Sequence, residues 1–341
     1  MKVIIYGTRG SRPTPSTKKK STSMFGGNTT CIYIEADDGT KHIIDAGTGI
    51  AELSQTLSEQ AELPAESQAE PSPFIANLYF SHAHWDHIQG LPFFMQAYSP
   101  KNSINVYGEA KIDIKAGSGA KDNLRIGNDL ERTLAYHPTP ALLLSVKGSG
   151  IRQVLDFQQN PRNFPATLDL LTGINGYTDF LMDKAPGFIG TIYQTGTLQV
   201  DTMLVNHPGG CVAYRFMETK KDGKLAELVV NTDFEPNPAT DKLMLNWWSN
   251  ADLVIADCQY EPEGSPITKN KFMKGWGHSD FQSDIRLASA AEAKHILLTH
   301  HEPKMDDFYH LDLERRAQAH AKMHAPRVFA ELAREQTVYE I

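Results

Sequence analysis

Apolar residues gather in short runs along the chain, and most of these runs stop at a turn. They occupy residues 1–7, 31–37, 41–47, 74–84, 103–108, 198–207, 211–217, 226–233, 251–259 and 293–301. Many are continuous in Val, Ile and Leu, which is typical of strands that are buried on both faces. The pattern therefore predicts a large sheet component.

Helical patterns are fewer than strand patterns. We predict one helix after Gly90, one over residues 280–294 with Ser279 or Asp280 as its N-cap, and one over residues 311–324. Strands that pack between helices form an α/β layered architecture. The fold class predicted from the pattern is therefore α/β.

Two stretches lie outside this alternation. Residues 54–73 are rich in Glu, Ser, Ala and Pro, which predicts the end of a helix followed by a mobile surface loop. Residues 109–150 contain the triplet GSG twice and little periodicity, which predicts an inserted loop or flap. We expect a single domain over residues 1–341, with 109–150 as an insertion within it.

Composition narrows the possible classes of protein. The 341 residues are 40% hydrophobic and 22% charged, as in ordinary soluble domains. The first residues read as a strand and turn rather than a secretory signal, and no apolar run is long enough to predict a membrane span, so we expect a cytoplasmic protein. The net charge of -8 argues against broad nucleic-acid binding. Three scattered cysteines predict neither a disulfide framework nor a thiolate metal cluster.

The densest polar motif is SHAHWDHIQG, residues 81–90, which follows an apolar run. His82 and His84 are two residues apart, so in an extended chain both point to one face and can ligate the same ion. Asp86 and His87 lie in the turn that follows, where they can face a neighbouring position. Four donors this close together predict a site for two metal ions.

Further donors also follow apolar runs. They are His207, Asp233, His278 in a glycine-flanked loop, and either His300 or His301, which spacing alone does not separate. Strands of one sheet can present such side chains at a common edge. The rest of the chain can therefore complete the metal shell.

These motifs, from GTRGSRPTP through FGGNTTC, IIDAGTGI, SHAHWDHIQGLPFF, NHPGG, NTDFE and GWGHS to THHEP, resemble the metallo-β-lactamase superfamily. Within it, they resemble the branch of cyclic-nucleotide phosphodiesterases, tRNA 3'-end-processing nucleases and cyclic-phosphate phosphodiesterases. The resemblance implies a four-layer αββα sandwich with a dinuclear metal site, and it suggests a homodimer.

Carried over position by position, the resemblance gives three histidines to the first metal: His82, His84 and His207. It gives Asp86, His87 and His300 to the second metal, with Asp233 bridging both. It places His278 near the scissile phosphate, as a general acid or a stabiliser of the transition state.

The chemistry of these residue types agrees with the resemblance. Imidazole and carboxylate donors without thiolate suit Zn first, with Mn or Fe as alternatives. Two ions bridged by a carboxylate can turn a shared water into hydroxide and stabilise the oxygens exchanged at phosphorus. A protonated His278 can then neutralise the leaving alkoxide. We take His278, Asp86 and Asp233 as the catalytic residues.

Two sets of neighbouring side chains have alternative interpretations. Asp45 either orients a metal-bound histidine through its second ring nitrogen or caps a glycine-rich turn. Phe93, Phe94 and Tyr98 either wall a pocket for a planar group or belong to the core.

The predicted function is hydrolysis of cyclic nucleotides or other small phosphodiesters. A simple hairpin joins His207 to Asp233, where tRNA-processing relatives insert an arm, and only a short span separates Asp233 from His278, where β-CASP nucleases carry a domain. Extended nucleic acid and membranes are therefore not expected partners. The alternatives are a lactonase, a thioesterase, a ribonuclease, or a non-catalytic metal-binding regulatory protein.

Overall fold

The computed structural model describes residues 1–62, 72–109, 142–144, 150–181, 189–237, 240–265 and 273–341. The predicted flap at residues 109–150 lies almost entirely outside these residues. No helix within the described ranges is both long enough and apolar enough to cross a membrane.

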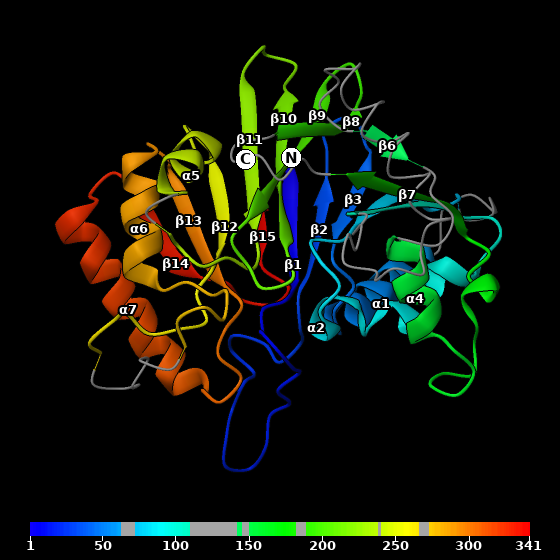
Figure 1. Ribbon diagram of the computed structural model, residues 1–341, viewed down its shortest axis with the longest axis horizontal. Coiled ribbons are helices and arrows are strands. Elements are labelled where there is room, and N and C mark those ends of the chain that lie inside the picture. Colours follow the sequence, from blue (N-terminus) through cyan, green and yellow to red (C-terminus); the bar gives the residue numbers. More distant parts are fainter. Residues whose placement is uncertain (63–71, 110–141, 145–149, 182–188, 238–239, 266–272) are drawn as a thin grey trace, which may run out of the picture.

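The strands form two sheets (Figure 1). The first has the order β15-β1-β2-β3-β4-β5-β7-β6, and the second has the order β14-β13-β12-β11-β10-β9-β8. In the first sheet the bounds are β1 Lys2–Gly7, β2 Cys31–Glu35, β3 Lys41–Ile44, β4 Ile75–Tyr79, β5 Ser103–Glu109, β6 Leu142–Leu144, β7 Ile174–Leu181 and β15 Val338–Glu340. In the second they are β8 Ile189–Gln194, β9 Leu198–Val205, β10 Cys211–Thr219, β11 Leu225–Asn231, β12 Leu253–Asp257, β13 His295–Thr299 and β14 Phe329–Leu332.

Helices cover the outer face of each sheet (Figure 1). On the first sheet lie α1 Gly49–Glu62, α2 Trp85–Ile88 and α4 Ile151–Gln158, with short 3-10 turns η1 Leu91–Phe93, η2 Met95–Tyr98 and η3 Leu168–Leu170. On the second lie α5 Asp241–Trp247, α6 Phe281–Ala290 and α7 Asp307–His324. The order of layers is helices, sheet, sheet, helices, as the predicted αββα sandwich requires.

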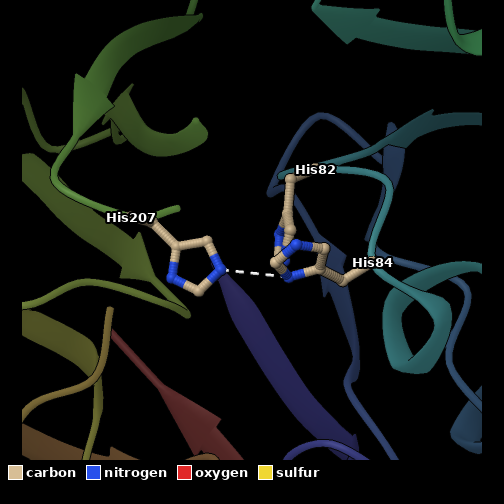
Figure 2. Close-up of side chains that lie close together, drawn as sticks. All are labelled: His82, His84 and His207. Carbon is tan, nitrogen blue, oxygen red and sulfur yellow. Dashed lines mark hydrogen bonds between the residues drawn. The ribbon is translucent and has the colours of Figure 1, made fainter. Parts of the chain in front are cut away.

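The two sheets meet with their loops at one edge. His82 and His84 follow β4 of the first sheet, and His207 follows β9 of the second, yet their rings lie side by side (Figure 2). Strands β11, β12 and β13 are parallel, so they end at the same edge of the second sheet. Loops after strands of both sheets therefore converge on one place.

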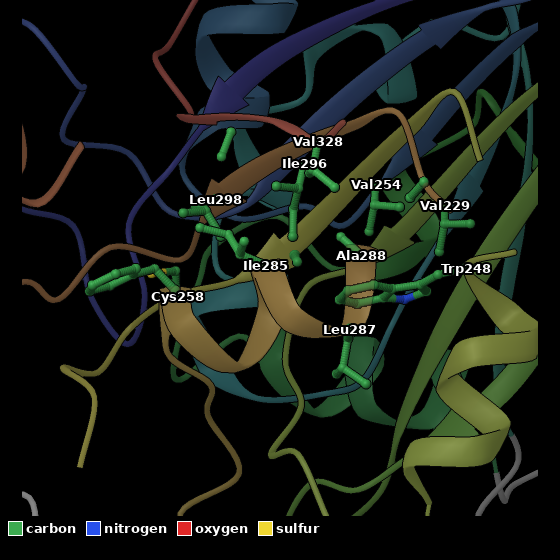
Figure 3. Packing of buried hydrophobic residues seen from close by; sticks show 14 of the residues in the cluster. Val229, Trp248, Val254, Cys258, Ile285, Leu287, Ala288, Ile296, Leu298 and Val328 are labelled. Carbon is green, nitrogen blue, oxygen red and sulfur yellow. The ribbon is translucent and has the colours of Figure 1, made fainter. Parts of the chain in front are cut away.

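Three hydrophobic clusters fill the spaces between the layers, and strand β12 shows how one sequence serves two of them. Leu253 and Ile255 belong to the cluster between the sheets. Val254 and Ala256 belong to the cluster beneath α5, α6 and α7, in which Figure 3 shows Val254. Because side chains alternate across a strand, a continuous apolar run buries both faces. This arrangement fixes the strand ends, which in turn position the polar loops.

Two of the three predicted helices are present, with different limits: α6 and α7. Asp280 is the N-cap of α6, since its side chain accepts from the backbone N–H of Gln282 and Ser283. The helix ends at Ala290, short of the predicted Lys294, because Glu292 adopts a left-handed backbone with φ of 58°. After Gly90 the chain forms two 3-10 turns instead of the predicted helix.

Candidate metal centre

The candidate site is built from residues that follow four strands. His82, His84, Asp86 and His87 come after β4, His207 after β9, Asp233 after β11 and His300 directly after β13. The structure thus brings together all seven predicted ligands. Their donor atoms form groups in which every atom lies within 4.8 Å of the others.

The first group consists of His82, His84 and His207. The ring of His82 lies 4.4 Å from that of His84 and 4.8 Å from that of His207, between centroids. Nε2 of His207 is 3.1 Å from Nδ1 of His84 (Figure 2). His82 and His207 are buried, whereas His84 is exposed, so this group lies on the solvent side of the site.

The second group consists of Asp86, His87 and His300, all buried. Oδ2 of Asp86 lies 3.4 Å from Nε2 of His87 and 3.3 Å from Nε2 of His300. The backbone N–H of Ser11 donates to the same oxygen at 2.7 Å, which holds the carboxylate in place. This group lies deeper than the first.

Asp233 stands between the two groups. Its Oδ2 lies 3.8 Å from Nε2 of His82 and 3.9 Å from Nε2 of His207. Its Oδ1 lies 3.2 Å from Nε2 of His87 and 3.3 Å from Nε2 of His300. Each oxygen of the carboxylate therefore faces a different group, which is the arrangement that a bridging ligand requires.

Nε2 of His82 is buried at the centre without a hydrogen-bonding partner. Nε2 of His87 and Oδ1 of Asp233 are buried as well and face one another at 3.2 Å. Buried polar atoms without partners are rare in folded proteins, and a bound ion is one way to satisfy them. Imidazole and carboxylate are also the donors that zinc and related divalent ions take. The residues present therefore fit the divalent metals that the sequence predicted.

Charges inside the cluster shift the pKa values of its members in opposite directions. Burial lowers the pKa of His82 well below its usual value, and the neighbouring His87 lowers it further. For His87, burial is outweighed by the carboxylates of Asp233, Asp86 and Asp45, which raise its pKa. Because a metal ligand must be deprotonated, a proton on His87 would compete with a metal at the second group.

Asp45 contacts His87, one of the two histidines of the second group, at its Nδ1. Its Oδ2 lies 2.7 Å from Nδ1 of His87 and accepts from the Ser81 hydroxyl at 2.7 Å, while its Oδ1 accepts from the Ser81 backbone N–H. Asp45 is fully buried. The contact that the first interpretation requires, between Asp45 and the second ring nitrogen of a histidine, is present.

His278 lies beside the two groups of donor residues and is paired with Asp257. Nδ1 of His278 is 2.6 Å from Oδ2 of Asp257 and 3.8 Å from Oδ2 of Asp233. Its ring stacks on that of His300, with 4.9 Å between centroids. Burial alone would lower the pKa of His278, but the carboxylate of Asp257 raises it to about 9. His278 is therefore a cation at neutral pH.

Asp257 is the residue of this site that the sequence reasoning missed. It is the last residue of β12 and lies in the candidate group with Asp233, His278 and His300. The signal was present, because Asp257 ends an apolar run as the other donors do.

The structure also separates His300 from His301. His300 adopts a left-handed backbone with φ of 58°, which turns its ring into the site. His301 is fully buried elsewhere, with Nε2 2.9 Å from the carbonyl oxygen of Ala333 and its ring 4.7 Å from that of His310. His300 is the member of the pair that joins the candidate site.

The aromatic residues after the motif divide between core and surface. Phe94 is fully buried in the core of the first sheet. The hydroxyl of Tyr98 donates to the carbonyl oxygen of Pro92 at 2.8 Å. Phe93 is 54% exposed, and its ring packs against Phe164. The core interpretation is therefore correct for Phe94, and Phe93 is a surface side chain.

Comparison with known proteins gives the fold its name. No family model matches the chain. A ribonuclease Z of Thermoplasma acidophilum is 23% identical over 330 residues, which cover 90% of this chain and 88% of the relative.

Solved structures that are similar to the chain over its whole length include the following three. The metallo-β-lactamase fold protein YhfI from Bacillus subtilis is 18% identical, with a TM-score of 0.56 and 98% of its own chain covered. The short form of human tRNase Z is 19% identical, with a TM-score of 0.54 and 99% covered. A diphosphatase of the PhnP family is 14% identical, with a TM-score of 0.54 and 97% covered. Together with the layered architecture, these similarities establish that the chain has the metallo-β-lactamase fold.

Proposed function

We propose that the protein is a dinuclear metal-dependent phosphodiesterase that hydrolyses small phosphodiesters such as cyclic nucleotides. The observation that carries the proposal is the position of Asp233, whose two oxygens face two separate groups of donors, next to His278, which is paired with Asp257. The ribonuclease Z relative and the diphosphatase neighbour support chemistry at phosphorus.

Some residues of the site would hold the metals, and others would contact the substrate. His82, His84 and His207 would hold one ion, and Asp86, His87 and His300 the other, with Asp233 shared. When bound, the two ions would supply an activated water and positive charge for the phosphoryl oxygens. Zinc is our first choice, with manganese or iron as alternatives, because the donor set excludes none of them.

His278 is suited to protonate the leaving group. Its pKa of about 9 keeps it protonated at neutral pH, and Asp257 occupies Nδ1, which leaves Nε2 as the ring nitrogen for the substrate. A leaving alkoxide needs such a proton, because it is a strong base. The Asp257–His278 pair thus complements the metal groups.

The preference for small substrates has two supports. Between His207 and Asp233 the chain forms a plain antiparallel hairpin of β10 and β11, with residues 220–224 as its turn. The net charge of -8 disfavours binding to an extended polyanion.

We also keep the homodimer and the cytoplasmic location as predictions.

The function is tested by metal analysis followed by a substrate panel. Protein loaded with zinc or with manganese would be assayed on 2',3'- and 3',5'-cyclic nucleotides, linear dinucleotides, short RNAs and bis(p-nitrophenyl) phosphate. We expect turnover of at least one small phosphodiester that disappears on chelation and returns with metal. Absence of turnover on every phosphodiester by protein that holds two metals per chain would refute the proposal.

A second candidate function is endonucleolytic processing of tRNA. The observation that favours it is the ribonuclease Z relative, together with the human tRNase Z neighbour. Precursor tRNA therefore belongs in the same panel. If kcat/KM for precursor tRNA exceeds that for every small phosphodiester, the ribonuclease interpretation replaces the small-substrate one.

A further inference from the structure

One carboxylate, that of Glu235, holds the loop that carries His278. Its Oε1 accepts from the backbone N–H of Gly275 at 3.0 Å, and its Oε2 accepts from the same N–H at 2.8 Å. Oε2 also accepts from the backbone N–H of Gly277 at 3.0 Å. Hydrogen bonds to an ionised acceptor are stronger than bonds between neutral groups. Two amides of the 275–278 loop are thus fixed by one side chain.

Glu235 is itself fixed to the loop of His207. Its backbone N–H donates to the carbonyl oxygen of Asn206 at 2.8 Å, and the side-chain amide of Asn206 donates to the Glu235 carbonyl oxygen at 3.0 Å. Glu235 also follows Asp233 by two residues. It therefore connects the loops of His207, Asp233 and His278.

The 275–278 loop contacts His207 closely. Nδ1 of His207 lies 2.9 Å from the carbonyl oxygen of Gly277, which makes Nδ1 the donor and leaves Nε2 directed at the site. Gly277 has φ of 87°, and a Cβ there would lie 2.2 Å from Nδ1 of His207. A displacement of this loop would therefore move both His207 and His278.

Few other contacts are seen at the solvent side of the loop among the residues that the structure describes. Lys274 and Gly275 are exposed, and the indole of Trp276 is 61% exposed, so none of these three residues is anchored in the core by its side chain. On the other side, the backbone N–H of Tyr260 donates to the Ser279 carbonyl oxygen at 3.0 Å. Among the described residues, the Glu235 carboxylate is therefore the side chain that restrains the backbone at the exposed end.

We infer that Glu235 is a positioning residue, which sets the orientation of His207 and the placement of His278 through the 275–278 loop. Its effect on rate rests on the proposed function, whereas its effect on the loop does not. Substitution of residues that orient metal ligands typically lowers metal affinity or activity by about 10–100-fold. An amide at this position would keep one acceptor oxygen but lose the negative charge and the second oxygen, which also accepts from Gly275, so it would restrain the loop less firmly than the carboxylate.

The first test measures the loop directly and needs no substrate. Hydrogen exchange of the Gly275 and Gly277 amides would be compared in the wild type, Glu235→Gln, Glu235→Ala and the control Glu263→Gln, whose side chain is exposed. We expect roughly tenfold faster exchange or more in Glu235→Ala, an intermediate rate in Glu235→Gln and no change in the control. Unchanged exchange at both amides in Glu235→Ala would overturn the inference.

The second test asks whether Glu235 acts through His278. In metal-loaded protein we expect Glu235→Gln to lower kcat on a nucleoside ester by about 10–100-fold. In the double variant that combines Glu235→Gln with His278→Ala, kcat should fall by clearly less than the product of the two single effects, because both changes act on His278. Fully multiplicative losses would overturn the pathway through His278. If the wild type hydrolyses no phosphodiester, the proposed function fails, and the exchange experiment still decides the role of Glu235.

Discussion

Nδ1 of His278 lies 2.6 Å from Oδ2 of the buried Asp257, and the pair borders the carboxylate of Asp233. Because Asp257 also accepts from the backbone N–H groups of Phe234 and Gln259, its position is fixed independently of the histidine. The pair therefore holds a protonated imidazole in one orientation next to the metal groups. Under the proposed function, this pair would link proton transfer to the metal chemistry.

Replacement of His278 should affect substrates according to their leaving groups. We expect His278→Ala to retain both metals and to lose about 10²–10⁴-fold in kcat/KM on nucleoside esters, whose alkoxides need a proton. The loss should be much smaller on nitrophenyl esters, because nitrophenolate leaves without one. Steady-state kinetics on both classes measures the difference, and equal losses would point instead to electrostatic stabilisation of the phosphoryl oxygens.

Replacement of Asp257 should change the pH profile rather than the metal content. The Asp257 carboxylate raises the pKa of His278 to about 9, so activity that needs the imidazolium is lost as pH rises through that value. Asp257→Asn removes the charge, which should move the alkaline limb of kcat/KM to lower pH. A profile that keeps the wild-type alkaline limb would exclude His278 as its source.

Asp45 should affect how tightly the second group of donor residues binds its metal ion. Asp45→Asn keeps the shape of the side chain and suits the left-handed backbone at this position, where φ is 62°. Without the carboxylate that faces Nδ1 of His87, we expect affinity for one of two metals to fall by about 10–100-fold. Competitive titration with a chromogenic chelator measures this, with the exposed Asp156→Asn as control. Equal affinity in both variants would reduce Asp45 to a residue that shapes its turn.

Much of the fold could be predicted because single strands carry unambiguous signals. The run Leu253–Asp257 is apolar throughout, and the structure buries both of its faces. Helix α1 was harder to recognise, although Ile50, Leu53 and Leu57 follow a helical spacing. Its exposed residues merge in composition with the Glu- and Pro-rich segment beyond, so only its end was predicted.

The candidate site, like the fold, could be predicted only in part from the sequence. Dense motifs such as residues 81–90 identify donors locally, and the ends of parallel strands explain why they meet. Spacing could not choose between His300 and His301, because the choice depends on the backbone angle of one residue. It also could not predict the contacts of Asp257 with His278 or of Glu235 with Gly275, since these partners are distant in sequence and meet only in the folded chain.

Glu335 should make stability depend on pH at a distance from the metal groups. Its carboxylate accepts from the backbone N–H of Asn28 at 2.6 Å and from the Asn28 side-chain amide at 3.1 Å. Burial nevertheless raises its pKa to about 7, from an ordinary value of 4.5. Between these values the folded state binds more protons than the unfolded state, so the free energy of unfolding falls as pH rises.

Glu335→Gln should remove this contribution. We expect the variant to lose less stability than the wild type between about pH 4.5 and pH 7, the window set by the unfolded and folded pKa values. Urea unfolding at a series of pH values measures it, with Glu263→Gln as the exposed control. Parallel curves for the wild type and Glu335→Gln would contradict the raised pKa.

The last prediction concerns the number of metals that Asp233 serves. Its two oxygens face different groups, so Asp233→Ala should weaken both sites and leave fewer than two metals per chain. Asp86→Ala removes a donor from the second group alone, and His84→Ala removes one from the first group alone, so each should spare one metal. Because a ligand stabilises the state that binds it, chelation should lower Tm less in Asp233→Ala than in the wild type. Metal analysis by mass spectrometry, together with thermal unfolding before and after chelation, tests the three variants side by side. If Asp233→Ala still binds two metals with wild-type affinity, the carboxylate bridges neither group, and its position between them serves only to balance the charge of the histidines.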